Sequence, residues 1–261
     1  MQPTIKFLDK SLLEQIVSEA THILCKLGVD VQNKTVLSLL ADHGAQVDME
    51  KMHVIFTEDV IEKALQTVPK SFKLYNVHGD ETHNFYGQQV YFTPGSSALK
   101  ILDPHTGKMR KPVTADYANY AKVVSQLKNI ASQSTAMIPT DVPESISDSY
   151  RLFLSLLYCE KPVVTGAFSI AGFEIMKNLQ LTVRGTEKAL MEKPLAIFTC
   201  CPTSPLRWSD LTSQNLFDCA RYAISVLSGH EGGANALAAR VATVLNAEAV
   251  ITTATDTNKN L

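Results

Sequence analysis

The stretch "KPVVTGAFSIAGFEIMKNLQLTVRGTEKALMEKPLAIFTC", residues 161–200, decides the predicted fold. It begins with a short apolar run, "KPVVTGAF", continues with the helical pattern "SIAGFEIMKNLQLTV", and ends with a second short apolar run, "KPLAIFTC". Two short apolar runs joined by an amphipathic helix predict a β–α–β unit, because parallel strands need a long crossover connection.

The segments on both sides of this stretch repeat the same alternation. Helical patterns occupy "TADYANYAKVVSQL" (114–127), "PESISDSYRLFLSLLYC" (143–159) and "TSQNLFDCARYAIS" (212–225), and "ASQSTAMIP" (131–139) is strand-like. Short strands that alternate with longer helices predict an α/β fold built on a parallel sheet.

The first 88 residues follow a different pattern. "SLLEQIVSEATHILCKL", residues 11–27, has helical spacing, with Ser11 and Glu14 as a capping box and Gly28 as a stop. A second helix is predicted over 34–43, and a third after an N-cap at Thr57. Residues 71–103 alternate and contain several glycines, which predicts short strands and turns. We therefore expect an N-terminal extension of helices and β-hairpins.

Composition narrows the class of protein. The 261 residues are 45% hydrophobic and carry a net charge of −2, which is ordinary for a globular protein and argues against nucleic-acid binding. No apolar run of about 18 residues predicts a membrane span, so we expect a cytoplasmic protein. The five cysteines form no CxxC, and no HExxH occurs, so no metal site is predicted.

Polar residues stand where two of the predicted strands end. Thr165 and Gly166 close the first apolar run of the opening stretch, and Thr199 and Cys200 close the second. Because α/β folds place their ligands at the carboxyl ends of parallel strands, these residues are candidates for a binding site.

Two further polar positions have alternative interpretations. Ser96 and Ser97 follow the Pro94–Gly95 turn, where they either line a pocket or belong to a plain hairpin. Asp141 follows a predicted strand, where it either balances the charge of a cationic substrate or caps the helix that begins near Pro143.

The stretch "SGHEGGAN", residues 228–235, combines three glycines with a histidine before a predicted helix. The free N–H groups at a helix N-terminus suit a carboxylate or phosphate, so an anion-binding turn is one interpretation. A plain turn between a strand and a helix is the other. The residues concerned are Gly229, His230, Gly232 and Gly233.

Residues 1 to about 225 resemble the trimethylamine methyltransferase family, the corrinoid-dependent methylamine and betaine methyltransferases. The carrying stretches are "VYFTPGSSALKILDPHTGKMRKPVTADYANYAKVVSQLKNI", "PTDVPE", "KPVVTGAFS" and "KPLAIFTCCPTSPLRWSD". The resemblance implies a TIM barrel behind an N-terminal extension. It also implies methyl transfer from a tertiary or quaternary amine, of trimethylamine or betaine type, to Co(I) of a corrinoid.

The resemblance also carries expectations about partners and site. The chain would bind no cofactor directly, because the corrinoid (cobalamin) is carried by a partner protein. The partners would be that protein and a small methylated amine, and formation of a homo-oligomer stays open. The barrel mouth would be lined by Ser96, Ser97, Asp141, Thr165, Gly166, Thr199 and Cys200. No catalytic residue is assigned.

The resemblance covers about half of a usual family member. Residues 1–88 would form the extension and residues 89–225 the first half of the barrel, giving a partial, TIM-barrel-like parallel sheet. The region in which trimethylamine enzymes carry pyrrolysine matches no residue here. Betaine-type members lack pyrrolysine altogether, so the amine stays open.

The tail, residues 226–261, resembles a fragment of the cobalt-precorrin-5A hydrolase family through "VLSGHEGGANALAARVATVLNAEAVITTATDTN". The chain is therefore expected to be a truncated or chimeric methyltransferase with a junction near residues 224–227. Two alternatives are a cobalt-precorrin hydrolase of cobalamin biosynthesis and an inactive truncated fragment.

Overall fold

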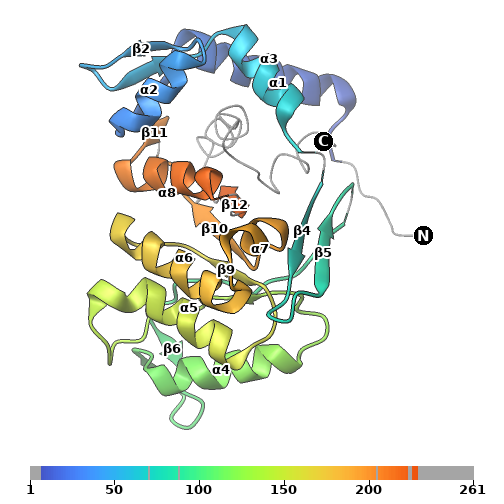
Figure 1. Ribbon diagram of the computed structural model, residues 1–261, viewed down its shortest axis with the longest axis vertical. Coiled ribbons are helices and arrows are strands. Elements are labelled where there is room, and N and C mark those ends of the chain that lie inside the picture. Colours follow the sequence, from blue (N-terminus) through green and yellow to red (C-terminus); the bar gives the residue numbers. More distant parts are fainter. Residues whose placement is uncertain (1–6, 70, 88, 204, 223–224, 229–261) are drawn as a thin grey trace.

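The computed structural model describes residues 7–69, 71–87, 89–203, 205–222 and 225–228 (Figure 1). In this part of the chain a parallel sheet with its helices adjoins an N-terminal sheet with its own helices. None of the helices described is long and apolar enough to cross a membrane.

The parallel sheet is wound in one direction. Its spatial order is β12-β10-β9-β8, and every neighbouring pair is parallel. The strands are β8 (Gln133–Ser134), β9 (Val163–Thr165), β10 (Ala196–Cys200) and β12 (Ser225–Ser228). Each new strand is added beside the previous one, without the reversal of order that defines a doubly wound sheet. This is the winding of a barrel, and it confirms the predicted α/β class.

A fifth segment lies beside β8. The N–H of Ser97 donates to the carbonyl of Thr135, and the N–H of Ala98 donates to that of Ala136. Ala98 also forms a parallel bridge with Met137. Residues 96–98 therefore extend the parallel sheet at its β8 side.

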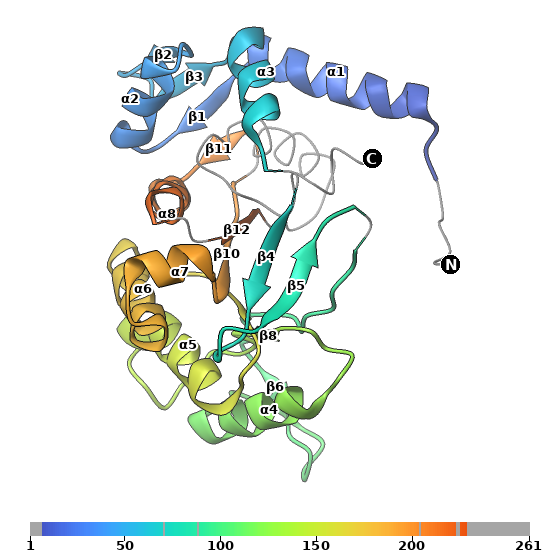
Figure 2. The same ribbon diagram turned by 45° about the vertical axis from the view of Figure 1, so that its right-hand side comes forward.

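Helices connect the parallel strands. They are α4 (Thr114–Gln126), the short 3₁₀ turn η1 (Glu144–Ile146), α5 (Ser147–Tyr158), α6 (Ile170–Arg184), α7 (Glu187–Glu192) and α8 (Asp210–Arg221). Figure 2 shows α5, α6 and α8 on one side of the sheet and the β4–β5 hairpin on the other. The helix side holds the main core, in which Phe198 of β10 packs against Phe173 of α6 with ring centroids 5.0 Å apart.

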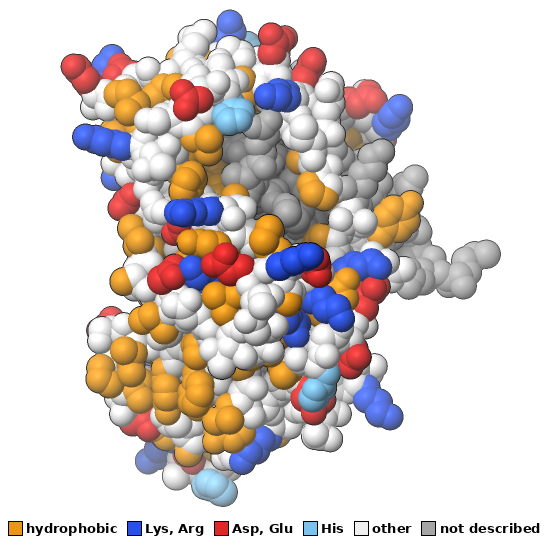
Figure 3. Space-filling view, in the orientation of Figure 1, with side chains coloured by type: hydrophobic (Ala, Val, Ile, Leu, Met, Phe, Trp, Pro, Cys, Tyr) orange, Lys and Arg blue, Asp and Glu red, His pale blue; other side chains and the backbone are white. Residues whose placement is uncertain are grey.

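The same helices also carry apolar side chains on their outer surface. Figure 3 shows these side chains gathered over α4 and α5, where Val123, Phe153 and Leu157 are exposed. These helices therefore present one apolar side to the sheet and another to the surface.

The N-terminal part is a small mixed sheet with helices. Its strand order is β11-β1-β3-β2, antiparallel except for the β1–β11 pair. The elements are α1 (Lys10–Lys26), β1 (Val29–Val31), α2 (Lys34–Asp42), β2 (Gln46–Asp48), β3 (His53–Ile55), α3 (Glu58–Thr67) and β11 (Arg207–Trp208).

The helix ends test the sequence predictions directly. The side chain of Thr57 accepts the N–H of Val60, which confirms it as the N-cap of α3. The predicted capping box at Ser11 is wrong, because α1 begins earlier and Asp9 accepts the N–H of Leu12 at 2.8 Å. Gly28 has φ +70°, a left-handed conformation that glycine adopts without strain, and it follows the end of α1 as expected.

Two hairpins come between the N-terminal part and the parallel sheet along the chain. They are β4 (Phe72–Tyr75) with β5 (Glu81–Phe85), and β6 (Ile101–Leu102) with β7 (Met109–Arg110). Within the run of short strands predicted over 71–103, residues 89–95 ("QVYFTPG") form no strand. Arg184 of α6 fastens the first hairpin by donating to the carbonyls of Tyr75, Asn76 and Val77.

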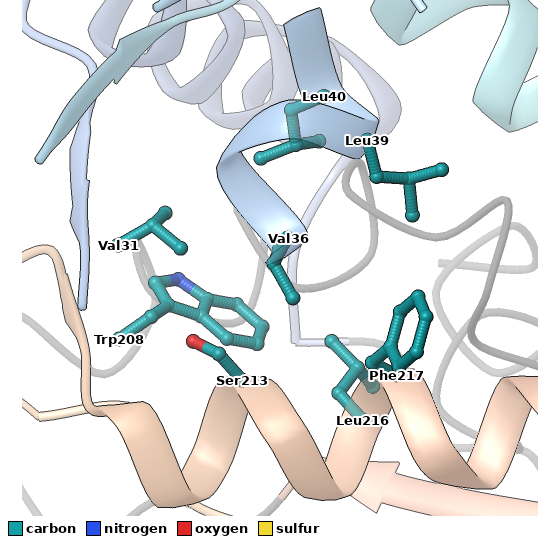
Figure 4. A pocket seen from close by; sticks show the side chains of 8 residues that line it. All are labelled: Val31, Val36, Leu39, Leu40, Trp208, Ser213, Leu216 and Phe217. Atoms are coloured by element: carbon teal, nitrogen blue, oxygen red, sulfur yellow. The ribbon is translucent and has the colours of Figure 1, made fainter. Parts of the chain in front are cut away.

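The chain passes from the parallel sheet to the N-terminal sheet after β10, where β11 pairs with β1. Figure 4 shows Trp208 packed between Val31, Val36 and the residues of α8, around a hollow of about 40 Å³. Nearby, the amide of Asn33 donates to Asp210 at 2.7 Å and to Gln214 at 3.0 Å. This junction fixes the N-terminal sheet against the start of α8.

Candidate functional site

A hollow of about 400 Å³ opens at the carboxyl ends of β9 and β10, next to the segment 96–98. It is lined by Ser96, Ser97, Thr135, Gly166, Ala167, Phe168, Thr199, Cys200, Cys201, Ser209, Leu211, Thr212 and Asn215. We call it the mouth pocket. Barrel enzymes bind their substrates at this end of the strands, because the loops that follow the strands converge there.

Most of the residues selected from the sequence meet in this pocket. Ser96, Ser97, Gly166, Thr199 and Cys200 line it directly. Thr165 stands immediately behind, because its carbonyl accepts the Thr199 hydroxyl at 2.9 Å and its own hydroxyl accepts from Thr135 at 3.3 Å. The structure thus brings these side chains together, and their roles in binding stay predictions.

Asp141 lies outside the mouth pocket. Its Oδ1 accepts the N–H of Thr114, the first residue of α4, at 2.9 Å. Asp141 therefore caps a helix, but the capped helix is α4 and not the one near Pro143 that the sequence suggested. A role of Asp141 in binding stays a prediction.

The predicted anion-binding turn, with Gly229, His230, Gly232 and Gly233, lies outside the described residues. It stays a prediction. The same holds for the resemblance of the tail to a cobalt-precorrin hydrolase.

Cys200 is a buried thiol. It belongs to the apolar core together with Cys219 and Leu216. Burial raises the pKa of Cys200 to about 12, so the thiol stays protonated at neutral pH. A protonated, buried thiol is a weak nucleophile, and Cys200 therefore contributes packing to the pocket wall.

Arg151 is the most informative residue that sequence reasoning missed. It stands on α5 and is 1% exposed. Its Nε donates to the carbonyl of Ser147 at 3.2 Å, and its Nη1 donates to the Thr135 carbonyl at 2.9 Å and to Ser97 Oγ at 3.1 Å. Its guanidinium lies 4.2 Å from the centroid of the Phe168 ring. The signal in the sequence is an arginine inside the apolar run "YRLFLSLL", but periodicity does not tell where its side chain points.

A second hollow, of about 570 Å³, shares Phe168 with the mouth pocket. It contains the carboxylates of Glu144 and Asp148. Asp148 is 2% exposed and accepts the N–H of Phe168 at 2.8 Å. Phe168 therefore separates a hydroxyl-rich pocket without ionised lining residues from a hollow that carries acidic groups.

The described residues contain no group of three or more His, Cys, Asp or Glu side chains arranged to hold a metal ion. The chemistry that the mouth pocket offers is hydrogen bonding from hydroxyl groups, an aromatic face and a buried positive charge behind it.

These features define a barrel-type α/β protein with a pocket at the carboxyl ends of its strands. The fold is similar to that of the monomethylamine methyltransferase (MtmB) of Methanosarcina barkeri, with a TM-score of 0.58 at 13% sequence identity. The similarity covers 95% of this chain and 52% of the solved one, and it confirms the predicted TIM-barrel-like fold.

The family model described as Trimethylamine methyltransferase (MTTB) matches residues 1–256, and the chain belongs to this family. The Trimethylamine methyltransferase MttB of Desulfitobacterium hafniense (strain DSM 10664 / DCB-2) is 24% identical over 220 residues, 84% of this chain and 44% of that protein. The Glycine betaine methyltransferase of Desulfitobacterium hafniense (strain Y51) is 22% identical over 209 residues, 80% and 43%. The chain thus spans less than half the length of these relatives. The family match continues past residue 225, where the expected junction lies.

Proposed function

We propose that this chain acts in methyl transfer from a tertiary or quaternary amine to the Co(I) of a corrinoid carried by a separate protein. The observation that carries the proposal is the family match over residues 1–256. The L-carnitine:corrinoid methyltransferase of Eubacterium limosum, 29% identical over 164 residues, 60% of this chain and 32% of that protein, supports a corrinoid acceptor.

In this proposal the mouth pocket holds the methylated amine. Its volume of about 400 Å³ suits a small molecule. Phe168 offers an aromatic ring, which attracts a quaternary ammonium group. The Thr199 hydroxyl already gives its proton to the carbonyl of Thr165, so it turns only lone pairs to a ligand and suits a cation.

A corrinoid brought by a partner would reach the amine from outside. The pocket opens to the surface beside the exposed residues Ser96 and Cys201, which supports such an approach. When bound, the corrinoid supplies a Co(I) centre that accepts the methyl group. The part of this chain is to orient the amine with one N–CH₃ bond facing the opening and to keep water away from it.

The charge change of the amine suits such a pocket. When a quaternary amine loses a methyl group, the nitrogen keeps the electron pair of the broken C–N bond and its positive charge disappears. A pocket without an ionised lining residue holds the departing neutral amine weakly, because no strong ion pair persists.

The test is a methyl-transfer assay with the full chain and a reduced corrinoid protein. Trimethylamine, glycine betaine and L-carnitine are each added, and the loss of Co(I) absorbance is followed. The proposal expects at least one amine to be demethylated, and Thr199→Val to slow the reaction. Absence of transfer with every amine, by a chain that unfolds cooperatively, would contradict the proposal and favour an inactive fragment.

A further inference from the structure

Behind the mouth pocket lies the positive charge of Arg151, which forms no ion-pair contact among the described residues, although the buried carboxylate of Asp148 on the same helix acts on it at longer range. Arg151 is fully buried, and no Asp or Glu of that part of the chain comes within ion-pair distance of it. Its hydrogen bonds go to two carbonyls and to the Ser97 hydroxyl. Burial lowers the pKa of Arg151 despite the nearby charge of Asp148, so the cost of burying the guanidinium is only partly offset, and an anion bound nearby would offset more of it.

The hydroxyl groups of the pocket differ in what they can still donate. Thr135, Thr199, Ser209 and Thr212 each give their proton to another protein oxygen. These four can only accept from a ligand. Ser97 Oγ accepts from Arg151, and among the described residues no acceptor takes its proton. The Ser97 hydroxyl is therefore a donor that stays available to the pocket.

The backbone at Ser97 is held in a conformation that serine rarely adopts. Its φ is +60°, in the left-handed region that favours glycine. The position is fixed by two hydrogen bonds, from the Ser97 N–H to the carbonyl of Thr135 and from Arg151 to Ser97 Oγ. Strain of this kind persists where surrounding contacts over-determine it, and it gathers at functional positions.

We propose that Ser97, backed by the guanidinium of Arg151, binds an anionic oxygen of the substrate and makes this pocket selective for methylated ammonium compounds that carry a carboxylate. A hydroxyl that accepts from a guanidinium is a stronger donor, because the two hydrogen bonds polarise each other. Ser97 contacts the substrate, and Arg151 acts through Ser97 as a positioning residue. This inference rests on the proposed function and adds the feature of the substrate that is recognised.

The test is calorimetric binding by the full chain of two probes with the same cationic head. Glycine betaine carries a carboxylate, and tetramethylammonium does not. The native chain is expected to bind glycine betaine at least about tenfold more tightly, because a charge-assisted hydrogen bond is gained. Ser97→Ala should remove most of this preference and leave tetramethylammonium binding unchanged. Ser38→Ala, an exposed hydroxyl on α2, is the matched control and should leave the preference intact.

Two further variants separate binding from a purely structural role. Ser97→Gly relieves the left-handed backbone while it removes the hydroxyl, so the chain should stay folded and should still lose the preference. Arg151→Lys keeps a positive charge but loses the Nε donor to Ser147 and the guanidinium contact with Phe168, so it should position Ser97 less well and weaken glycine betaine binding alone.

Equal binding of both probes by the native chain would overturn this inference and leave the proposed function standing. A preference that survives Ser97→Gly and Ser97→Ala would overturn it as well. Binding of neither probe would contradict the proposed function and this inference together.

Discussion

Replacement of Arg184 by methionine tests how the β4–β5 hairpin is held to the barrel-type sheet. The guanidinium donates to four carbonyl oxygens, those of Lys193 at 2.8 Å, Val77 at 3.0 Å, Tyr75 at 3.2 Å and Asn76 at 2.7 Å. Each bond is worth about 0.5–1.5 kcal/mol net, or more for a charged donor. Water reaches part of this half-buried site and replaces some of the bonds. We therefore expect Arg184→Met to lower the free energy of unfolding by about 2–4 kcal/mol.

The assay is urea denaturation followed by far-ultraviolet circular dichroism, with the slope against urea compared between variants. Arg184→Lys is the first control. An ammonium group is a point donor and cannot reach all four carbonyls around the edge of the guanidinium, so lysine should recover less than half of the loss. Lys188→Met, at an exposed position of α7, is the second control and should change stability by less than about 0.5 kcal/mol. A loss below about 0.5 kcal/mol for Arg184→Met would refute the reasoning.

Two other predictions concern titratable groups. Burial lowers the pKa of His83 to about 4, so the folded chain binds a proton less readily than the unfolded chain. The contribution of His83 to the free energy of unfolding is therefore fully present above the ordinary histidine pKa of 6.5. It is lost as the pH drops from 6.5 towards 4. His83→Gln should flatten this part of the profile in urea titrations, and an unchanged slope would show that other groups cause it. In the native chain, iodoacetamide at pH 8 should label the exposed Cys201 well before the buried Cys200, as read by peptide mass spectrometry. Equal rates would mean that the pocket wall opens freely.

Local patterns account for much of the parallel sheet. The apolar runs after Lys161–Pro162 and Lys193–Pro194 become β9 and β10, because strands buried on both faces are continuously apolar. The helix α7 was not predicted, since six residues are too few to show a helical period. The strand β11 is equally short and depends on its pairing with β1.

The candidate site was predictable where position along a strand decides it. Thr165, Gly166, Thr199 and Cys200 come together because parallel strands end at the same edge of the sheet. The contacts of Arg151 with Ser97, and of Asp141 with Thr114, join residues 54 and 27 positions apart. Patterns of local spacing contain no information on such pairs.

The β1–β11 pair has a consequence for the order of folding. Asp30 is paired with Arg207, so the N-terminal sheet is completed by residues made much later in synthesis. The hydrogen bond from the Asn33 amide to Asp210, 177 positions later in the chain, likewise forms only after Asp210 has been made. Long loops close slowly, because their closure entropy is lost before the contacts form. During translation, β1 therefore emerges with one edge unpaired, and it stays available to other strands until the ribosome has released residue 208.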